Sequence, residues 1–436
     1  MMQLSEYGNS RALYAGWLQQ LPTECHWAVA DSALLQAIAL NKPVQRGPRG
    51  RRLEMLVRLF AKIRLVYLLL LVVGAIELVR LLLQQRRESG IAEPGMAGLA
   101  GEFQLPAFYF VGFGAGAEEQ LFARYCAEID SPVGRIDQTK VETMGRLRRV
   151  GILRAFKTLF RSVRLARQAM AHLPEIYKSR EVDFLTFIGL RISYFSYVSA
   201  WFEKLPAHVP DIREVCFLAA DTAAFAAANT GLPTRFMQHG LMRRSEVLPH
   251  FNRVDALTHD ESDYFRQHLP RAAIYLARTN SNQIPDRDHH CILVASIYGR
   301  YEEMRRILPF LEVAAQLGVA IHVRPHPREN LGFWQTVRLP FDVSMEDRDA
   351  TFDDALDRLQ PALVVSWFST ALVDALYRGV IPVSVSACDD PDIQDMVYPL
   401  FKHCLHWPTD QVELKKIIAD RDSREQALAR LRDGME

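Results

Sequence analysis

The feature that most constrains the fold is a regular alternation of short apolar runs with helical segments in residues 106–385. Strand-like runs occur at 106–111, 215–220, 234–237, 254–258, 291–296, 320–324, 362–366 and 381–385. Helical segments separate most of these runs, and parallel strands need a crossover connection of this kind. The pattern therefore predicts an α/β fold with doubly wound parallel sheets.

A polar stretch without periodicity, 279–290, divides the strand-like runs into two sets and is predicted to be an interdomain linker. We expect two Rossmann-like domains facing a cleft, at 101–278 and 291–436. Residues 1–100 form an N-terminal region without this alternation. Within it, 24–30 is predicted to be a short strand and Asp31 to cap a helix that runs through Asn41.

The overall charge excludes some partners. Lys and Arg total 52 against 51 Asp and Glu, a net charge of +1, so nothing global indicates nucleic acid. The six cysteines are widely separated and none forms a CxxC pair, which argues against a zinc ribbon or a thioredoxin-type site. This cysteine usage, and an N-terminus without a signal-peptide pattern, predict a cytoplasmic chain.

Positive charge is nevertheless concentrated in the N-terminal half. Residues 46–87 hold ten Lys and Arg, opposed only by Glu54 and Glu77, around an uncharged run of twelve residues at 65–76. A membrane-spanning helix needs about 20 apolar residues. The run therefore favours an in-plane or partly inserted membrane helix, while a buried core helix and a true span remain alternatives.

A second basic stretch, 146–167, carries eight basic residues and no acidic one. Its helical spacing predicts one apolar face and a basic stripe beside it. The face consists of Leu153, Phe156, Phe160, Val163 and Met170, and the stripe of Arg154, Lys157, Arg161 and Arg164. Such a helix is typical of a contact with anionic lipid, and the alternative is a solvated helix packed on its own domain.

Candidate site residues follow the predicted strands, because ligands of open parallel sheets bind outside the carboxyl ends of the strands. In the second domain these residues are Ser296, Arg324, His326, Arg328, Ser366, Ser369 and Thr370. In the first domain they are Gly112–Gly116, Asp221, His239 and Asp260.

Three of these positions suggest a chemistry. Ser369 and Thr370 open a helix, and a helix N-terminus with free N–H groups suits a phosphate, although an ordinary N-cap has the same sequence pattern. His326 is held between two prolines near two arginines, so it can donate a hydrogen bond to a phosphate oxygen. His239 and Asp221 are alternative general bases, and Asp221 can equally be an N-cap.

The order of these motifs resembles the GT-B glycosyltransferases of bacterial surface polysaccharide synthesis. The similarity lies in His239-Gly, in Arg324-Pro-His326-Pro, and in Ser366-Trp-Phe-Ser369-Thr370 before a Gly-x-x-Pro strand. CDP-glycerol glycerophosphotransferases have the most similar patterns, and capsule sialyl- and Kdo-transferases share the His-Pro and paired-hydroxyl motifs.

The resemblance implies that 291–436 binds a nucleotide-activated donor and that 101–278 binds the acceptor. His326, Ser369 and Thr370 would hold the donor phosphate, whereas His239, Arg243, Arg244 and Glu119 would lie on the acceptor side. It implies a transferase that uses a nucleotide sugar, a lipid-linked or glycan acceptor and an anionic membrane surface, at the cytoplasmic face of the bacterial inner membrane. No metal or cofactor is expected. The alternatives are a GT-B nucleotide-sugar epimerase and a non-catalytic membrane-associated scaffold.

Overall fold

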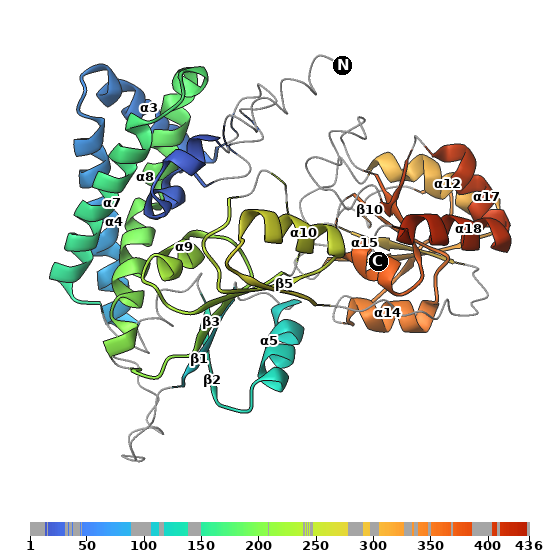
Figure 1. Ribbon diagram of the computed structural model, residues 1–436. Coiled ribbons are helices and arrows are strands. Elements are labelled where there is room, and N and C mark those ends of the chain that lie inside the picture. The colour runs from blue at the N-terminus through green and yellow to red at the C-terminus, as the bar shows by residue number, and fades with distance from the viewer. Residues whose placement is uncertain are drawn as a thin grey trace. The chain divides into compact units, whose positions relative to one another are not determined.

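The computed structural model divides the chain into two compact units, which are described separately (Figure 1). Unit 1 comprises 1–238, 245–255 and 265–275, and unit 2 comprises 239–244, 256–264 and 276–436. The structure describes residues 16–30, 46–88, 106–112, 117–137, 150–207, 209–238, 247–277, 291–296, 305–326, 339–347, 350–367, 369–385, 403–407 and 410–433, with isolated residues between them.

Unit 1 is built on a six-stranded sheet with the order β2-β1-β3-β4-β5-β6. The strands are β1 (Phe108–Gly112), β2 (Val133–Asp137), β3 (Glu214–Phe217), β4 (Thr234–Met237), β5 (Arg253–Ala256) and β6 (Ala273–Leu276). The pairs from β2 through β5 are parallel. The middle strands β3 and β4 are almost wholly buried, which explains their continuous apolar sequences.

Shorter helices follow β1, β3 and β5, and a layer of longer helices, two of which lie between β2 and β3 in the chain, packs beside the sheet. The shorter helices are α5 (Ala117–Glu128), α9 (Thr222–Ala228) and α10 (His259–His268), of which α10 is divided between the two units. The layer consists of α3 (Pro48–Lys62), α4 (Val66–Glu88), α7 (Ile152–Ala171) and α8 (Glu181–Phe202). Short 3₁₀ turns η2 (Glu175–Arg180) and η3 (Leu205–Ala207) flank α8.

Helix α8 is the centre of this layer and is buried on nearly all sides. It contacts α3, α4, α7 and α9, and its apolar sequence has no polar face, as a fully enclosed helix requires. Gly189 allows this packing, because a Cβ there would lie 2.9 Å from Leu53 of α3. The ring of Phe195 stacks on Trp27 with centroids 4.1 Å apart.

One expectation for unit 1 is wrong. Residues 23–28 form a 3₁₀ helix, η1 (Thr23–Ala28), instead of a strand. Pro22 precedes its first turn, and Cys25, Trp27 and Ala28 are buried against the helical layer rather than paired in a sheet. The predicted helix from Asp31 lies largely outside the described residues.

The predicted apolar face of α7 is divided between the two sides of the helix. The buried side consists mainly of small residues with Leu159, Leu165 and Met170, whereas Leu153 and Phe160 are exposed. Small side chains let α7 approach α8 closely, and Ser196 Oγ donates a hydrogen bond to Ser162 Oγ at 3.0 Å between them.

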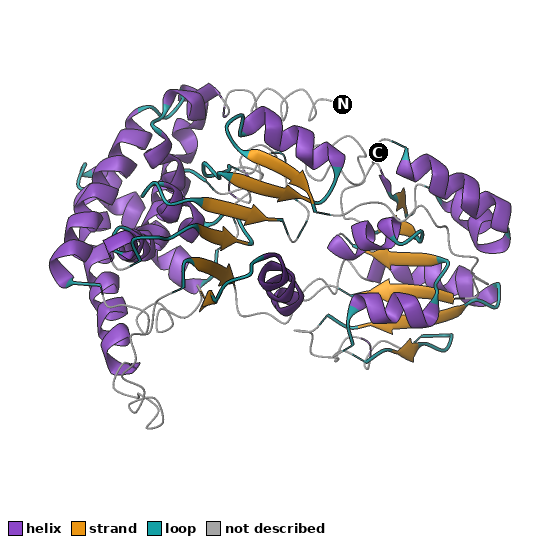
Figure 2. Cartoon of the chain, turned by 60° about the horizontal axis from the view of Figure 1, so that its bottom comes forward, coloured by secondary structure: helices purple, strands orange, loops and turns teal. Residues whose placement is uncertain are grey.

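Unit 2 contains a second six-stranded sheet with the order β12-β11-β10-β7-β8-β9, in which all neighbouring strands are parallel (Figure 2). Its strands are β7 (Cys291–Ala295), β8 (Ala320–Arg324), β9 (Ser344–Met345), β10 (Leu363–Ser366), β11 (Ile381–Ser384) and β12 (Leu405–His406). Its helical segments are η4 (Arg305–Ile307), α12 (Leu308–Gln316), α14 (Phe352–Leu359), α15 (Thr370–Tyr377), α17 (Gln411–Ala419) and α18 (Arg421–Arg432).

Local signals fix several boundaries in unit 2. Thr351 and Asp354 form a capping box at the start of α14, which satisfies otherwise unpaired N–H groups. Gly318 and Gly379 follow α12 and α15 with φ of +74° and +75°, a conformation that glycine adopts without strain. The two parallel α/β sheets confirm the predicted fold class of two Rossmann-like domains.

Candidate functional site

Strand order defines one switch point in each sheet. In unit 2 the chain moves outward from β7 to β8 and β9, and then resumes at β10 on the other side of β7. In unit 1 it moves from β1 to β2 and resumes at β3 on the other side of β1. Connections leave a switch point in opposite directions, so the crevice outside the carboxyl ends of the two strands is open to a ligand.

The unit 2 switch point brings together three of the motifs singled out in the sequence. Strands β10, β7 and β8 are neighbours, and their carboxyl ends lead into Ser366, Ser296 and Pro325-His326. Neighbouring strands lie about 4.8 Å apart, so the ends of β10 and β8 are separated by about 10 Å. That span matches the phosphates and ribose of a nucleotide rather than a single anion.

Two predicted serines at this edge support the sheet. Ser366 is fully buried, and its Oγ donates to the carbonyl oxygen of Ala295 at 2.7 Å. Ser296 is buried too, and its backbone N–H donates to the carbonyl oxygen of Arg324 at 3.0 Å. These bonds hold β10, β7 and β8 in register at the switch point.

Ser369 and Thr370 begin α15 directly after β10. Ser369 is the N-cap, and its side chain accepts a hydrogen bond from the N–H of Ala371 at 3.2 Å. Both residues are only partly buried. The first turn of α15 therefore presents N–H groups and the positive end of the helix dipole at the switch point.

Arg324 ends β8 on the other side of β7. Its Nη2 donates to the carbonyl oxygen of Ala350 at 2.9 Å, and Phe352 lies under the guanidinium with its ring centroid 5.9 Å away. Burial lowers the pKa of Arg324 because the charged group has lost part of its hydration. Its buried Nε has no hydrogen-bond partner among the residues that the structure describes. A partly desolvated arginine with a spare donor is well suited to bind an anion.

His326 follows Pro325 and is half-buried at the same edge. Arg328, the other arginine predicted here, lies outside the described residues. His322 of β8 has a structural role, because its Nδ1 lies 2.9 Å from Oε1 of Glu346, the residue after β9. Burial and the nearby Arg358 lower the pKa of His322.

The segment after β4 clusters with unit 2. His239 and Arg243 lie outside the described residues, but Gly240 approaches the start of α15, since a Cβ built on it would lie 3.5 Å from Thr370 Oγ1. Arg244 is held by the fold, because its Nη2 donates to the carbonyl oxygen of Asp260 at 3.2 Å and its guanidinium covers the ring of Tyr264 at 4.4 Å. Gly240 and the start of α15 are therefore neighbours.

Sequence reasoning missed a buried carboxylate beside this segment. Glu261 is almost fully buried, and its Oε1 accepts from the N–H of Met242 at 3.3 Å. The strand-like run at 254–258 placed Asp260 at a strand end, but nothing in the residue types distinguished its neighbour Glu261 as the one facing the His-Gly segment.

In unit 1, Asp221 lies beyond β3 at the other switch point. Its Oδ1 accepts from the N–H groups of Ala223 and Ala224 at 2.9 and 3.1 Å, so it caps α9. The same carboxylate is close enough to influence Tyr194, whose pKa is raised well above its usual value by burial and then by Asp221. Asp221 is therefore an N-cap, and it also contributes negative charge at the carboxyl end of the sheet.

Of the two acids that open α5, the predicted Glu119 is exposed and forms an ion pair with Arg135 at 2.7 Å. Its neighbour Glu118 is almost fully buried at the end of β1. A Cβ on Gly112 would collide with Oε2 of Glu118, so this glycine is required for the carboxylate to reach its place. Glu118 is the acid at the switch point, and the sequence did not separate it from Glu119.

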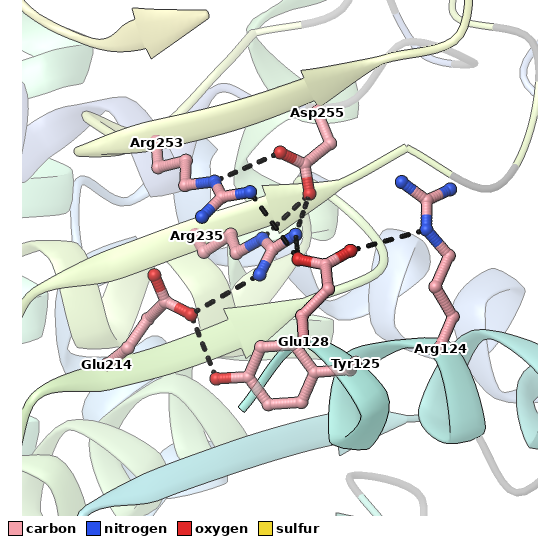
Figure 3. Close-up of polar contacts among 7 residues, drawn as sticks. All are labelled: Arg124, Tyr125, Glu128, Glu214, Arg235, Arg253 and Asp255. Carbon is pink, nitrogen blue, oxygen red and sulfur yellow. Dashed lines mark hydrogen bonds and ion pairs between the residues drawn. The ribbon is translucent and has the colours of Figure 1, made fainter. Parts of the chain in front are cut away.

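A cavity of about 370 Å³ in unit 1 lies at the opposite, amino ends of the strands. Figure 3 shows the polar cluster beside it, in which Arg235 contacts Asp255, Glu128 and Glu214. Tyr125 of α5 donates to Glu214 at 2.9 Å. Because α5 contributes Tyr125 and Glu128, this cluster fixes α5 against the sheet.

No protein-family model matches the sequence, and no curated protein matches it. Among solved structures, the UDP-GlcNAc 2-epimerase of Methanocaldococcus jannaschii with UDP-GlcNAc and UDP is 10% identical over 75% of this chain and 99% of that chain, with a TM-score of 0.42. The glycosyltransferase SnogD of Streptomyces nogalater is 13% identical over 75% and 94%, with a TM-score of 0.43. The UDP-N-acetylglucosamine 2-epimerase of Rickettsia bellii is 12% identical over 55% and 76%, with a TM-score of 0.36. Similarity at this level assigns no function to this chain.

Proposed function

We propose that this protein is a GT-B-type glycosyltransferase that moves a sugar from a nucleotide donor to a glycan or lipid-linked acceptor in bacterial surface polysaccharide synthesis. The observation that carries the proposal is the unit 2 switch point, where Arg324 and His326 lie at the end of β8 and α15 starts after β10, the two strands on either side of β7. This edge combines a desolvated guanidinium that has a spare donor with a helix N-terminus. Both groups favour a phosphate.

In this mechanism the acceptor hydroxyl oxygen attacks the anomeric carbon of the donor sugar. The bond from that carbon to the phosphate oxygen breaks, and its electron pair leaves with the nucleotide. Arg324, His326 and the N–H groups at Thr370 stabilise the charge that develops on the leaving phosphate. These groups supply the positive charge that the step requires, so the proposal assigns no role to a metal ion or cofactor.

The proton of the acceptor hydroxyl passes to a general base, for which His239 and Asp221 are the two candidates. Asp221 already uses one carboxylate oxygen to cap α9. Histidine is the side chain that most often acts as a general base near neutral pH. Gly240, the residue that follows His239 in the sequence, lies close to Thr370. We therefore favour His239 as the general base.

The test is nucleotide binding followed by turnover. We expect one of CMP, CDP, UDP and GDP to raise the thermal unfolding temperature of the full chain, because a ligand that binds only the folded form stabilises it. Arg324→Gln and His326→Ala should each lower the affinity for that nucleotide by at least about tenfold. Arg430→Gln is the matched control, because Arg430 is an exposed arginine of α18 paired with Glu413. Failure of all four nucleotides to bind would contradict the proposal.

The alternatives predict different results in the same assay. A nucleotide-sugar epimerase would convert the free donor without an acceptor, whereas a transferase releases nucleotide only when acceptor is present. A non-catalytic scaffold would show unchanged nucleotide affinity in His326→Ala. We place the transferase at the cytoplasmic face of the inner membrane, and fractionation of cells that express the tagged protein tests this location.

A further inference from the structure

The helical layer of unit 1 carries an unusual concentration of exposed apolar side chains. Of the eighteen large apolar side chains that are exposed among the described residues, thirteen lie on α3, α4, α7 or the α3–α4 turn. They are Met55, Leu56, Leu59, Ile63, Leu65, Leu68, Val72, Ile76, Val79, Leu83, Ile152, Leu153 and Phe160. An apolar surface of this extent marks a binding face.

Helix α4 shows the pattern most clearly because it is apolar on two opposite sides. Its inner side packs on α7 and α8, where a Cβ on Gly74 would lie 2.8 Å from Leu159. Its outer side is a stripe with spacings of three and four residues, formed by Leu65, Leu68, Val72, Ile76, Val79 and Leu83. The stripe therefore faces away from the protein along the whole helix.

Positive charge surrounds the stripe, and the acidic residues close to it are neutralised. Glu54 pairs with Arg46 and Arg58, and Glu77 pairs with Arg49 and Arg80. The exposed basic side chains of the layer include Arg51, Arg52, Lys62, Arg64, Arg154, Lys157 and Arg164. Helix α4 contacts both α3 and α7 (Figure 1), so the basic residues lie on both sides of its outer stripe.

We propose that the outer face of α3, α4 and α7 docks in the plane of an anionic lipid bilayer, with the α4 stripe inserted among the acyl chains. This proposal deepens the membrane-bound part of the proposed function, but it depends only on the helical layer. An apolar face flanked by Lys and Arg is the arrangement that binds such an interface. A second copy of the chain fits less well, because a two-fold interface would bring the same basic residues together.

A transmembrane orientation fits less well for a different reason. Residues 66–85 of α4 are long and apolar enough to cross a bilayer, but the inner side of the helix is bound to its neighbours. Gln85 Oε1 accepts from Tyr197 Oη at 2.7 Å and from the N–H of Val150 at 3.1 Å, both in the protein interior. Spanning would break these contacts or carry the charged helices α3 and α7 into hydrocarbon, where each charge is costly.

The experiment is flotation of the full chain, without nucleotide, with phosphatidylcholine vesicles that contain or lack phosphatidylglycerol. The pair Val72→Gln and Ile76→Gln should lower the partition coefficient on the order of 100-fold. The matched control pair is Leu317→Gln and Val412→Gln, which alters exposed apolar residues of unit 2. Unchanged circular dichroism will show that the variants are folded.

A second pair tests the charge. Arg154→Gln with Lys157→Gln should weaken binding to phosphatidylglycerol vesicles by about fivefold per charge, and added salt should reduce that difference. Lys415→Gln with Lys416→Gln, on α17, is the matched control. Binding to neutral vesicles should change little.

Several outcomes would overturn the proposal. One is failure of the wild-type chain to float with anionic vesicles, and another is flotation of the Val72/Ile76 variant at the wild-type level. Wild-type dimers that this variant converts to monomers would assign the face to a second copy. Resistance to alkaline carbonate would assign α4 to a span. Because nucleotide binding is measured without vesicles, either proposal can fail while the other stands.

Discussion

Arg235 provides the sharpest test of how unit 1 is held together. Its side chain is 1% exposed on β4, and its Nη2 lies 2.5 Å from Glu128 of α5. Its Nε donates to Asp255 Oδ2 of β5 at 2.7 Å, and Tyr125 packs against the guanidinium (Figure 3). Arg235→Met keeps much of the side-chain volume and removes the charge, so the buried carboxylate of Asp255 and the more exposed one of Glu128 lose their main partner.

The size of the effect follows from what remains. Loss of one partner of a buried ion pair costs about 3–5 kcal/mol. Asp255 retains Arg253 at 3.1 Å, and Glu128 retains Arg124 at 3.4 Å. These remaining partners compensate for part of the lost interaction. We therefore expect Arg235→Met to lower the free energy of unfolding by an amount near the lower limit, about 3 kcal/mol.

The pH dependence has a definite sign. Burial alone raises the pKa of Glu128, but the hydrogen bond and charge of Arg235 outweigh it and hold the pKa below 4.5. In the wild type this carboxylate therefore stabilises the fold above pH 4.5, and that contribution is lost as the pH falls through its lower folded pKa. In Arg235→Met the effect of burial on Glu128 dominates and its folded-state pKa rises. Protonation of Glu128 then removes part of the destabilisation of the variant. The difference between the two proteins should shrink on acidification towards pH 4.5.

Hydrogen exchange of the β3–β5 peptides measures this effect within unit 1, which matters because a two-unit chain need not unfold in one step. A loss of about 3 kcal/mol raises the exchange rate of the protected amides by about 100-fold. Arg213→Met is the matched control, because Arg213 lines the same cavity and its side chain makes no ion pair among the described residues. A change below about tenfold, or one that is the same at acidic and neutral pH, would refute this account of the cluster.

Three further predictions test other parts of the chain. Gly112→Ala should displace Glu118 and destabilise unit 1 by about 1–3 kcal/mol in urea unfolding, whereas Gly151→Ala, with open space around its Cβ, should not; equal effects would contradict the packing of Glu118. Burial, the largest influence, lowers the pKa of His26 below 6.5, so the unfolded chain binds more protons and stability should fall as the pH drops below 6.5. In His26→Gln the urea unfolding midpoint should therefore depend less on pH between pH 5 and 7.5. The same pH dependence in the variant and the wild type would contradict this explanation. Ser369→Ala should lower the free energy of unfolding by about 1 kcal/mol through loss of an N-cap and should also weaken nucleotide binding. Thr351→Ala should lower the stability by a similar amount without changing nucleotide binding. Unchanged nucleotide affinity in Ser369→Ala would show that α15 is not part of the donor site.

The sequence predicted the central strands well because a strand buried on both faces leaves a continuous apolar run. The run at 234–237 matches β4 at both ends, and 320–324 matches β8. The sequence did not predict β2, β6, β9 and β12. These strands lie at or near the sheet edges, where one face or one side meets solvent, and β6 alternates exposed and half-buried residues. Edge strands need fewer apolar residues, so their signal is weak.

The candidate site was predictable where it depends on chain order and not predictable where it depends on side-chain direction. A strand followed by Ser369 and a helix predicts an N-cap at a carboxyl edge, and the structure has this arrangement. Ser366 and Ser369 are both serines at one strand end, yet one is buried in the sheet and the other caps the helix. Glu118 and Glu119 differ by about 100° around α5, and only the packing of Gly112 shows which one faces inward.

Helix α7 shows how far periodicity alone can lead. Its spacing predicted an apolar face beside a basic stripe, but spacing does not show which side of the helix packs on the protein. The buried side carries small residues such as Ala155 and Ala166 together with Leu159 and Met170. Leu153 is 88% exposed on the other side. Periodicity therefore detects that one side of a helix is apolar without identifying what covers it, and for α7 lipid covers the large residues if the vesicle experiment succeeds.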